Sequence, residues 1–136
     1  MNNKKILVVT GGKEFDEKEF YDIFSSFCKI EFDKTQKPEA FDLFASDKMR
    51  EYSAIVFYDM IRQTDDVHKN NFHKIFERGI GCVFLHHSIV SHQDWDEYEN
   101  ILGGRYYEKS YKDEGKIYGP STYKHDQDFN VIIIDS

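Results

Sequence analysis

Two adjacent histidines, His86 and His87, directly follow the apolar run Cys82-Val83-Phe84-Leu85. If that run is a strand, both imidazoles lie at a strand end, where α/β proteins place ligand-binding residues. An imidazole titrates near neutrality and binds metals, so either residue could act as a general acid or base or as a metal ligand. Adjacent side chains of an extended backbone point to opposite sides, so both can face one pocket only if the turn is distorted. The alternative is a structural histidine that hydrogen-bonds to neighbouring loops.

Other candidate site residues follow the remaining apolar runs. Gly11 and Gly12 end the first run, Asp59 ends the next one, and Ser88 comes after the histidines. The glycine pair would let a ligand approach the backbone, although a plain tight turn also explains it and the third glycine of a dinucleotide-binding motif is absent. Asp59 is either a carboxylate in a pocket or an ordinary turn residue.

Trp95, Gly104 and Arg105 are further candidates downstream. Trp95 and Tyr98 have helical spacing, which is also typical of core packing. Gly104 follows a glycine that would already suffice to end a helix, and Arg105 comes next. This second glycine and the arginine favour close backbone approach or contact with an anion.

A divalent metal such as zinc is the cofactor that histidine ligands would favour. Its ligand would be His86 or His87, with Asp59 and His92 as the nearest further donors. Adjacent histidines rarely bind one ion together, so the other ring would contact substrate or orient the ligand. Acid–base chemistry without a metal is the alternative, because no helical His-x-x-x-His spacing is present. Cys82 lies inside an apolar run and is expected to be an inert thiol.

The apolar runs predict the strands that position these residues. We expect Ile6–Thr10, Ser53–Tyr58 and Cys82–Leu85 to be buried strands at the centre of a sheet. Lys29–Asp33 alternates charged and apolar residues and predicts a half-buried strand near an edge, and Val131–Ile134 predicts a last strand. Strands that alternate with helices favour right-handed βαβ units and a mostly parallel sheet, which makes this an α/β domain.

Four intervening segments have apolar residues at helical spacing, with one buried face each. These residues are Phe20, Ile23, Phe24 and Phe27; Phe41 and Phe44; Phe72, Ile75 and Phe76; and Trp95, Tyr98, Ile101 and Leu102. Pro38 would open the second helix, while Thr64 would cap the start and Gly79 the end of the third. The polar stretch Arg105–Pro120 is expected to be a loop or an antiparallel excursion.

Composition excludes several partners. The chain has 136 residues, enough for one domain, and a formal net charge of −7 without a basic stripe. Nucleic acids and anionic membranes are therefore not expected as partners, and no apolar stretch is long enough to span a bilayer. The sequence contains 2 cysteines and no zinc-type spacing, so we expect a reducing, cytoplasmic location.

Four segments together resemble the ThuA-like (trehalose utilisation) family of the class I glutamine amidotransferase-like superfamily. They are Ile6–Gly12, Tyr52–Phe57, Gly79–Ser88, and the stretch from Trp95 through Leu102-Gly103-Gly104-Arg105-Tyr106. The similarity covers most of Lys5–Tyr107, and the histidine strand followed by Trp and Gly-Gly is its most specific part. It implies a flavodoxin-like three-layer sandwich formed by residues 1–136 as a single domain.

The resemblance implies a function in carbohydrate metabolism, on trehalose or another sugar derivative, with His86 and His87 as catalytic residues. The candidate substrate contacts are Gly11, Gly12, Asp59, Ser88, Trp95, Gly104 and Arg105. Where glutamine amidotransferases have a nucleophilic cysteine, this chain has His86, so we expect a sugar-related hydrolase or lyase and no glutaminase activity. ThuA-like domains usually continue with a His-Pro segment and an Asp-Glu motif. We therefore expect the chain to lack their usual C-terminal part, and a non-catalytic binding or interaction domain with an incomplete site is the alternative.

The predicted terminal strand Val131–Ile134 also bears on assembly. It is strongly apolar, and an uncovered apolar strand is a liability in a soluble protein. A two-fold homodimer would cover it, whereas a position inside the sheet would make a dimer unnecessary. We expect the homodimer.

Overall fold

A computed structural model describes residues 4–134 of the chain. The chain divides into two compact units, Met1–Tyr106 and Tyr107–Ser136. Within the described residues, no helix is both long and apolar enough to cross a membrane.

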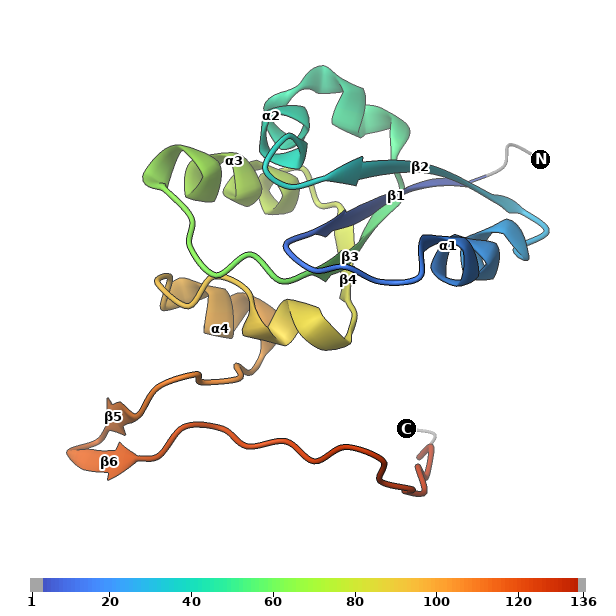
Figure 1. The fold of residues 1–136 in the computed structure, drawn as a ribbon. Helices are drawn as coiled ribbons and strands as arrows, with labels where there is room; N and C mark the ends of the chain where they lie inside the picture. Colours follow the sequence, from blue (N-terminus) through green and yellow to red (C-terminus); the bar gives the residue numbers. More distant parts are fainter. Residues whose placement is uncertain (1–3, 135–136) are drawn as a thin grey trace. The chain divides into compact units, whose positions relative to one another are not determined.

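The first unit is built on a four-stranded sheet with the order β2-β1-β3-β4 (Figure 1). The strands are β1 (Lys4–Gly11), β2 (Ile30–Gln36), β3 (Ala54–Asp59) and β4 (Gly81–Phe84). All three pairings are parallel, which confirms the predicted α/β class and the parallel pairing of the three apolar runs. β2 is an edge strand, as its alternating sequence predicts.

The position of β4 corrects one expectation. Cys82–Leu85 was expected at the centre of the sheet, but β4 is an edge strand in the described structure and ends at Phe84. Val83 is 49% exposed, so one face of this strand lacks the cover that a central strand has. An apolar run shows that a strand is favoured but does not reveal how many neighbours it acquires.

Helices lie on both faces of the sheet. α1 (Glu17–Ser25) packs on the face that contains Ile6 and Val8, whereas α2 (Ala40–Ala45), α3 (Asp66–Glu77) and α4 (Glu97–Leu102) belong to the core built around Leu7 and Val9. Figure 1 shows α1 on the opposite side of the sheet from α2 and α3. The strands that follow β1 in sequence, β2 and β3, lie on opposite sides of it. The carboxyl ends of β1 and β3 therefore flank the switch point where open α/β sheets bind ligands.

Some predicted helix details are wrong. Tyr21 and Phe24 form the buried face of α1, whereas Ile23 and Phe27 are exposed. α3 begins one residue later than expected, because Asp65 is its N-cap and accepts from the His68 N–H. α4 begins at Glu97, so Trp95 precedes it. The left-handed glycines Gly79 and Gly103 end α3 and α4 as predicted.

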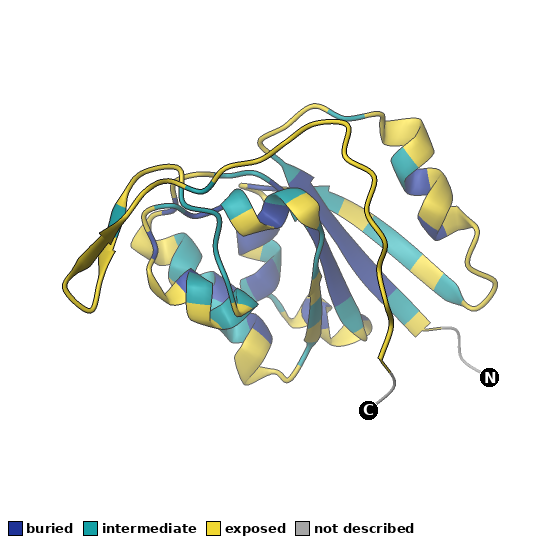
Figure 2. Ribbon diagram, turned by 90° about the horizontal axis from the view of Figure 1, so that it is seen from below, coloured by how far each residue is buried: buried dark blue, intermediate teal, exposed yellow. Residues whose placement is uncertain are grey.

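The second unit contains β5 (Tyr111–Asp113) and β6 (Lys116–Tyr118), which pair antiparallel and confirm the predicted excursion. The predicted strand Val131–Ile134 is wrong, since these residues form no strand. A β-branched run becomes a strand only when a neighbour supplies hydrogen-bond partners. Their side chains are 74–87% exposed (Figure 2), and self-association through them stays a prediction.

Candidate functional site

The turn after β1 brings three strand ends together. Gly11 and Gly12 have positive φ angles of 139° and 75°, and their lack of side chains lets the backbone approach Lys37 and Met60. The Lys37 N–H donates to the Thr10 carbonyl at 2.8 Å, and the Met60 N–H donates to the Gly11 carbonyl at 2.8 Å. The loops after β1, β2 and β3 therefore form one layer at the carboxyl edge of the sheet.

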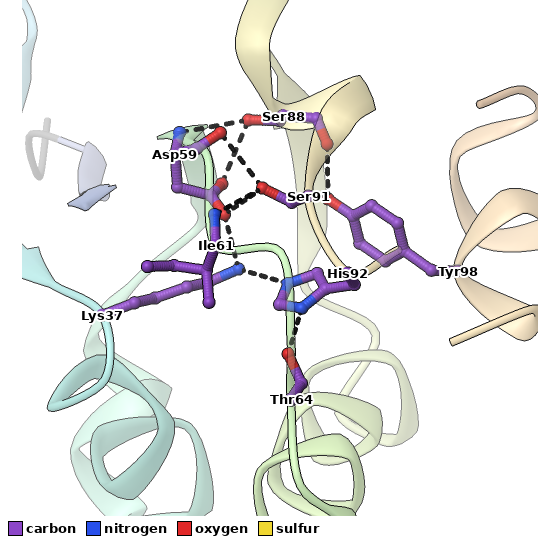
Figure 3. Close-up of polar contacts among 8 residues, drawn as sticks. All are labelled: Lys37, Asp59, Ile61, Thr64, Ser88, Ser91, His92 and Tyr98. Carbon is purple, nitrogen blue, oxygen red and sulfur yellow. Dashed lines mark hydrogen bonds and ion pairs between the residues drawn. The ribbon is translucent and has the colours of Figure 1, made fainter. Parts of the chain in front are cut away.

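A buried lysine occupies the centre of this layer (Figure 3). Lys37 follows β2, and its side chain is fully inaccessible, as is that of Asp59 at the end of β3. The Lys37 ammonium lies 2.9 Å from Asp59 Oδ2 and 2.8 Å from His92 Nε2. It also lies 5.2 Å from the ring centroid of each of three phenylalanines, Phe41, Phe57 and Phe72. Burial lowers the pKa of Lys37, and Asp59 opposes that shift.

Two serines complete the environment of the Asp59 carboxylate. Ser88 Oγ donates to Asp59 Oδ1 at 3.1 Å, and Ser91 Oγ donates to Oδ2 at 2.8 Å. Ser91 Oγ also accepts from the Ile61 N–H at 3.1 Å. Both members of the charge pair thus have hydrogen-bond partners beyond each other, which a buried ion pair requires. The two serine hydrogen bonds connect the end of β3 to the segment that follows β4.

His92 is a neutral hydrogen-bonding bridge in this network. A lysine ammonium can only donate, so His92 Nε2 accepts from Lys37, and Nδ1 must carry the proton that it donates to Thr64 Oγ1. Burial, assisted by the nearby charges of Lys37 and Arg105, lowers the pKa of His92 to about 2. The ring is therefore a structural connector and takes up no proton at neutral pH.

This neutral histidine predicts a pH dependence of stability. In the unfolded chain His92 takes up a proton below a pKa of about 6.5, whereas in the folded chain it does so only near 2. The contribution of neutral His92 to the stability of the fold is therefore fully present above pH 6.5 and decreases as the pH falls toward 2. Between pH 7 and pH 5 the loss from His92 is about 2 kcal/mol. His92→Gln keeps an acceptor for Lys37 and a donor for Thr64 but does not titrate. Between pH 7 and pH 5 the free energy of unfolding of this variant, measured in urea, should therefore fall by about 2 kcal/mol less than that of the wild type. The exposed control His125→Gln should match the wild type; an equal loss in all three proteins would contradict this assignment.

His86 and His87 follow β4 and lie at the surface of the same carboxyl edge of the sheet. They begin the short 3-10 helix η2 (His86–Val90), and a φ of 34° at His86 supplies the distorted turn that two adjacent histidines need to share one site. Their ring centroids are 4.2 Å apart. His87 Nε2 accepts from the Lys13 ammonium, so its proton lies on Nδ1, which has no hydrogen-bond partner among the described residues. Burial, and then the charges of His86 and Lys13, lower the pKa of His87, which is therefore neutral at pH 7.

Two surface hollows lie near this edge of the sheet, one lined in part by His86 and the other by Lys13, which contacts His87. The first has a volume of about 580 Å³ and is lined by Gly11, Gly12, Lys13, Glu14, Phe15, Glu17 and Gln36. The second has a volume of about 330 Å³ and is lined by Phe84, His86, Ile89, Leu102, Gly103 and Gly104. Four of the residues singled out in the sequence, Gly11, Gly12, His86 and Gly104, therefore line a hollow.

The remaining candidate residues lie inside the protein. Asp59 and Ser88 belong to the buried network, and Trp95 packs against Phe72 in the core. The Arg105 side chain is 4% exposed and donates to the carbonyls of His92, at 2.5 Å, and Trp95, at 3.1 Å. Substrate-binding roles for these four residues stay predictions.

Sequence reasoning missed Lys13 and Lys37. Lys13 follows the glycine turn, and its position after β1 could have identified it as a strand-end residue. Nothing in the pattern around Lys37 predicts its burial, which depends on the contact with Asp59 across 22 residues. Cys82 matches its prediction, because burial raises the pKa of its thiol to about 12.

Two observations in the described part of the chain bear on the predicted metal centre. Between residues 4 and 134 no group of three or more His, Cys, Asp or Glu side chains could hold a metal ion. His87 Nε2 already faces the Lys13 ammonium, which disfavours a cation at that atom. A metal role for His86 or His87 stays a prediction.

The fold and the site define an α/β domain with a histidine pair at the carboxyl edge of a parallel sheet. The family model described as ThuA, trehalose utilisation, matches residues 5–135. This chain therefore belongs to the ThuA family. Neither the curated proteins nor the solved structures include a significant match to it.

Proposed function

We propose that this domain acts on a sugar derivative, of trehalose or a related carbohydrate, at the carboxyl edge of its sheet. The observation that carries the proposal is the pair of imidazoles with ring centroids 4.2 Å apart, of which His86 lines one hollow and His87 contacts Lys13 of the other, in a chain of the trehalose-utilisation family. The first hollow is lined by ammonium, carboxylate, amide and aromatic side chains, which can hydrogen-bond to a hydroxyl-rich ligand and pack against it.

The two histidines have different parts in this proposal. Neutral His87 accepts a hydrogen bond from Lys13 and so holds a cationic donor beside the first hollow. His86 is exposed and is the residue that exchanges a proton with the bound sugar derivative as a general acid or base. The reaction class would be hydrolysis or elimination, in a cytoplasmic location that the two free thiols favour.

Turnover of trehalose and of oxidised trehalose derivatives by the purified protein tests the proposal. We expect His86→Gln to lower turnover about 100-fold or more, the usual contribution of a general acid or base. His87→Gln should lower it as well, because Lys13 loses its acceptor. The exposed His125→Gln serves as the control. Turnover that is equal in all four proteins would rule out the histidine site.

A binding domain without catalysis is the second candidate. It is favoured by the burial of Asp59 and Ser88, which removes a carboxylate and a hydroxyl from the exposed surface of the site. Saturable binding of a sugar derivative by the wild type, without any turnover, would favour this second function.

A further inference from the structure

The two hollows beside the histidine pair differ in chemistry. Lys13, Glu14, Glu17 and Gln36 give the first hollow charged and amide groups. The side chains that line the second hollow are apolar except for His86, namely Phe84, Ile89 and Leu102, and two glycines complete its wall. A single ligand that contacts both hollows would therefore need one polar and one apolar part.

Lys13 and the histidine pair link the two hollows through side-chain contacts. Lys13 lines the first hollow and contacts His87, and the His87 ring packs edge-on against the His86 ring, which lines the second hollow. A ligand that spans the pair would thus place the bond between its two parts next to the imidazoles. This is where an acid or base would have to act on a glycosidic oxygen.

We propose that the sugar derivative carries an apolar alkyl or aryl substituent, which the second hollow binds while the sugar lies in the first. This inference rests on the proposed function and specifies its substrate class. The second hollow, at about 330 Å³, exceeds the roughly 150 Å³ of a cavity that binds benzene. Its wall residue Ile89 is 41% exposed, so an apolar substituent would remove apolar surface from water.

Calorimetric titration with methyl, propyl and hexyl glucosides tests this inference. Full burial of one methylene strengthens binding about fourfold, and partial burial in an open hollow about twofold. We therefore expect hexyl glucoside to bind at least about 30-fold more tightly than methyl glucoside. Trehalose, which has a second polar sugar in place of the alkyl chain, should bind more weakly than hexyl glucoside.

Two variants alter the second hollow itself. Gly104 does not have a positive φ, and nothing lies within 4 Å of a Cβ added there, so Gly104→Leu should fold and fill the hollow. Ile89→Ser removes part of the apolar wall. Both should reduce the ratio of hexyl to methyl glucoside affinity to a few-fold or less. Ile23→Ser is the matched control, because Ile23 is 54% exposed on α1 and lines neither hollow.

The outcomes separate this inference from the proposed function. Equal affinity for methyl and hexyl glucosides would overturn the apolar substituent and leave the sugar site in place. A preference for hexyl glucoside that persists in both Gly104→Leu and Ile89→Ser would also overturn it, since the chain would then bind elsewhere. Absence of binding by all glucosides and by trehalose would overturn both proposals.

Discussion

Lys37→Met is expected to lower the free energy of unfolding by about 3–5 kcal/mol, as loss of one partner of a buried ion pair does. The substitution keeps the volume of the side chain but leaves the Asp59 carboxylate buried without its cation. It also removes the donor to His92 Nε2, so two groups of the network lose a partner. Urea unfolding at pH 7 would measure the change.

A surface ion pair provides the control for this prediction. Lys18 pairs with Asp22 at 2.8 Å, but their side chains are 85% and 62% exposed. Lys18→Met should therefore change stability by less than about 1 kcal/mol. The double variant Lys37→Met/Asp59→Leu should recover part of the loss, because no charge is left buried alone. A loss below about 1 kcal/mol for Lys37→Met would show that the pair is not buried as described.

Gly12→Ala is the second substitution with a large expected effect, about 3 kcal/mol or more. The new Cβ would lie 2.7 Å from the Met60 carbonyl carbon and 2.9 Å from Ile61 Cδ1. The φ of 75° adds the cost of a left-handed alanine, about 1–2 kcal/mol. The loops after β1 and β3 would have to separate, and both belong to the layer that supports the site.

Gly103→Ala separates the two contributions. Gly103 has a similar φ of 78°, but nothing lies within 4 Å of an added Cβ. Its replacement should therefore cost only the conformational part, about 1 kcal/mol. Thermal or urea unfolding of both variants would test the difference, and equal losses would mean that the close approach to Met60 contributes nothing.

The edge of the sheet at which the candidate residues lie could be predicted from the sequence. Apolar runs identify β1, β3 and β4, and parallel pairing brings the residues after them to one edge of the sheet. The requirement for a distorted turn at His86 and His87 also followed, because adjacent residues of a strand alternate in direction. Family resemblance based on the same segments is confirmed by the match over residues 5–135.

The interior of the site could not be predicted in the same way. A lysine after a strand is ordinarily exposed, and only the three-dimensional pairing with Asp59 and His92 accounts for the burial of Lys37. The apolar pattern also does not predict where in the sheet a run will pair, or whether it will pair at all. β4 and Val131–Ile134 have similar apolar runs, yet one is an edge strand and the other forms no strand. Apolar periodicity reports a preference for burial, whereas pairing depends on which neighbours are present.

Backbone amide NMR shifts on addition of methyl glucoside test most directly whether a sugar binds at the carboxyl edge of the sheet. We predict shifts in Gly11–Phe15 and in His86–His87, which line or join the two hollows. The exposed residue Val67 on α3 should not shift. Saturable shifts confined to residues outside the loops after β1 and β4, or no shifts at millimolar sugar, would contradict a sugar site at this edge.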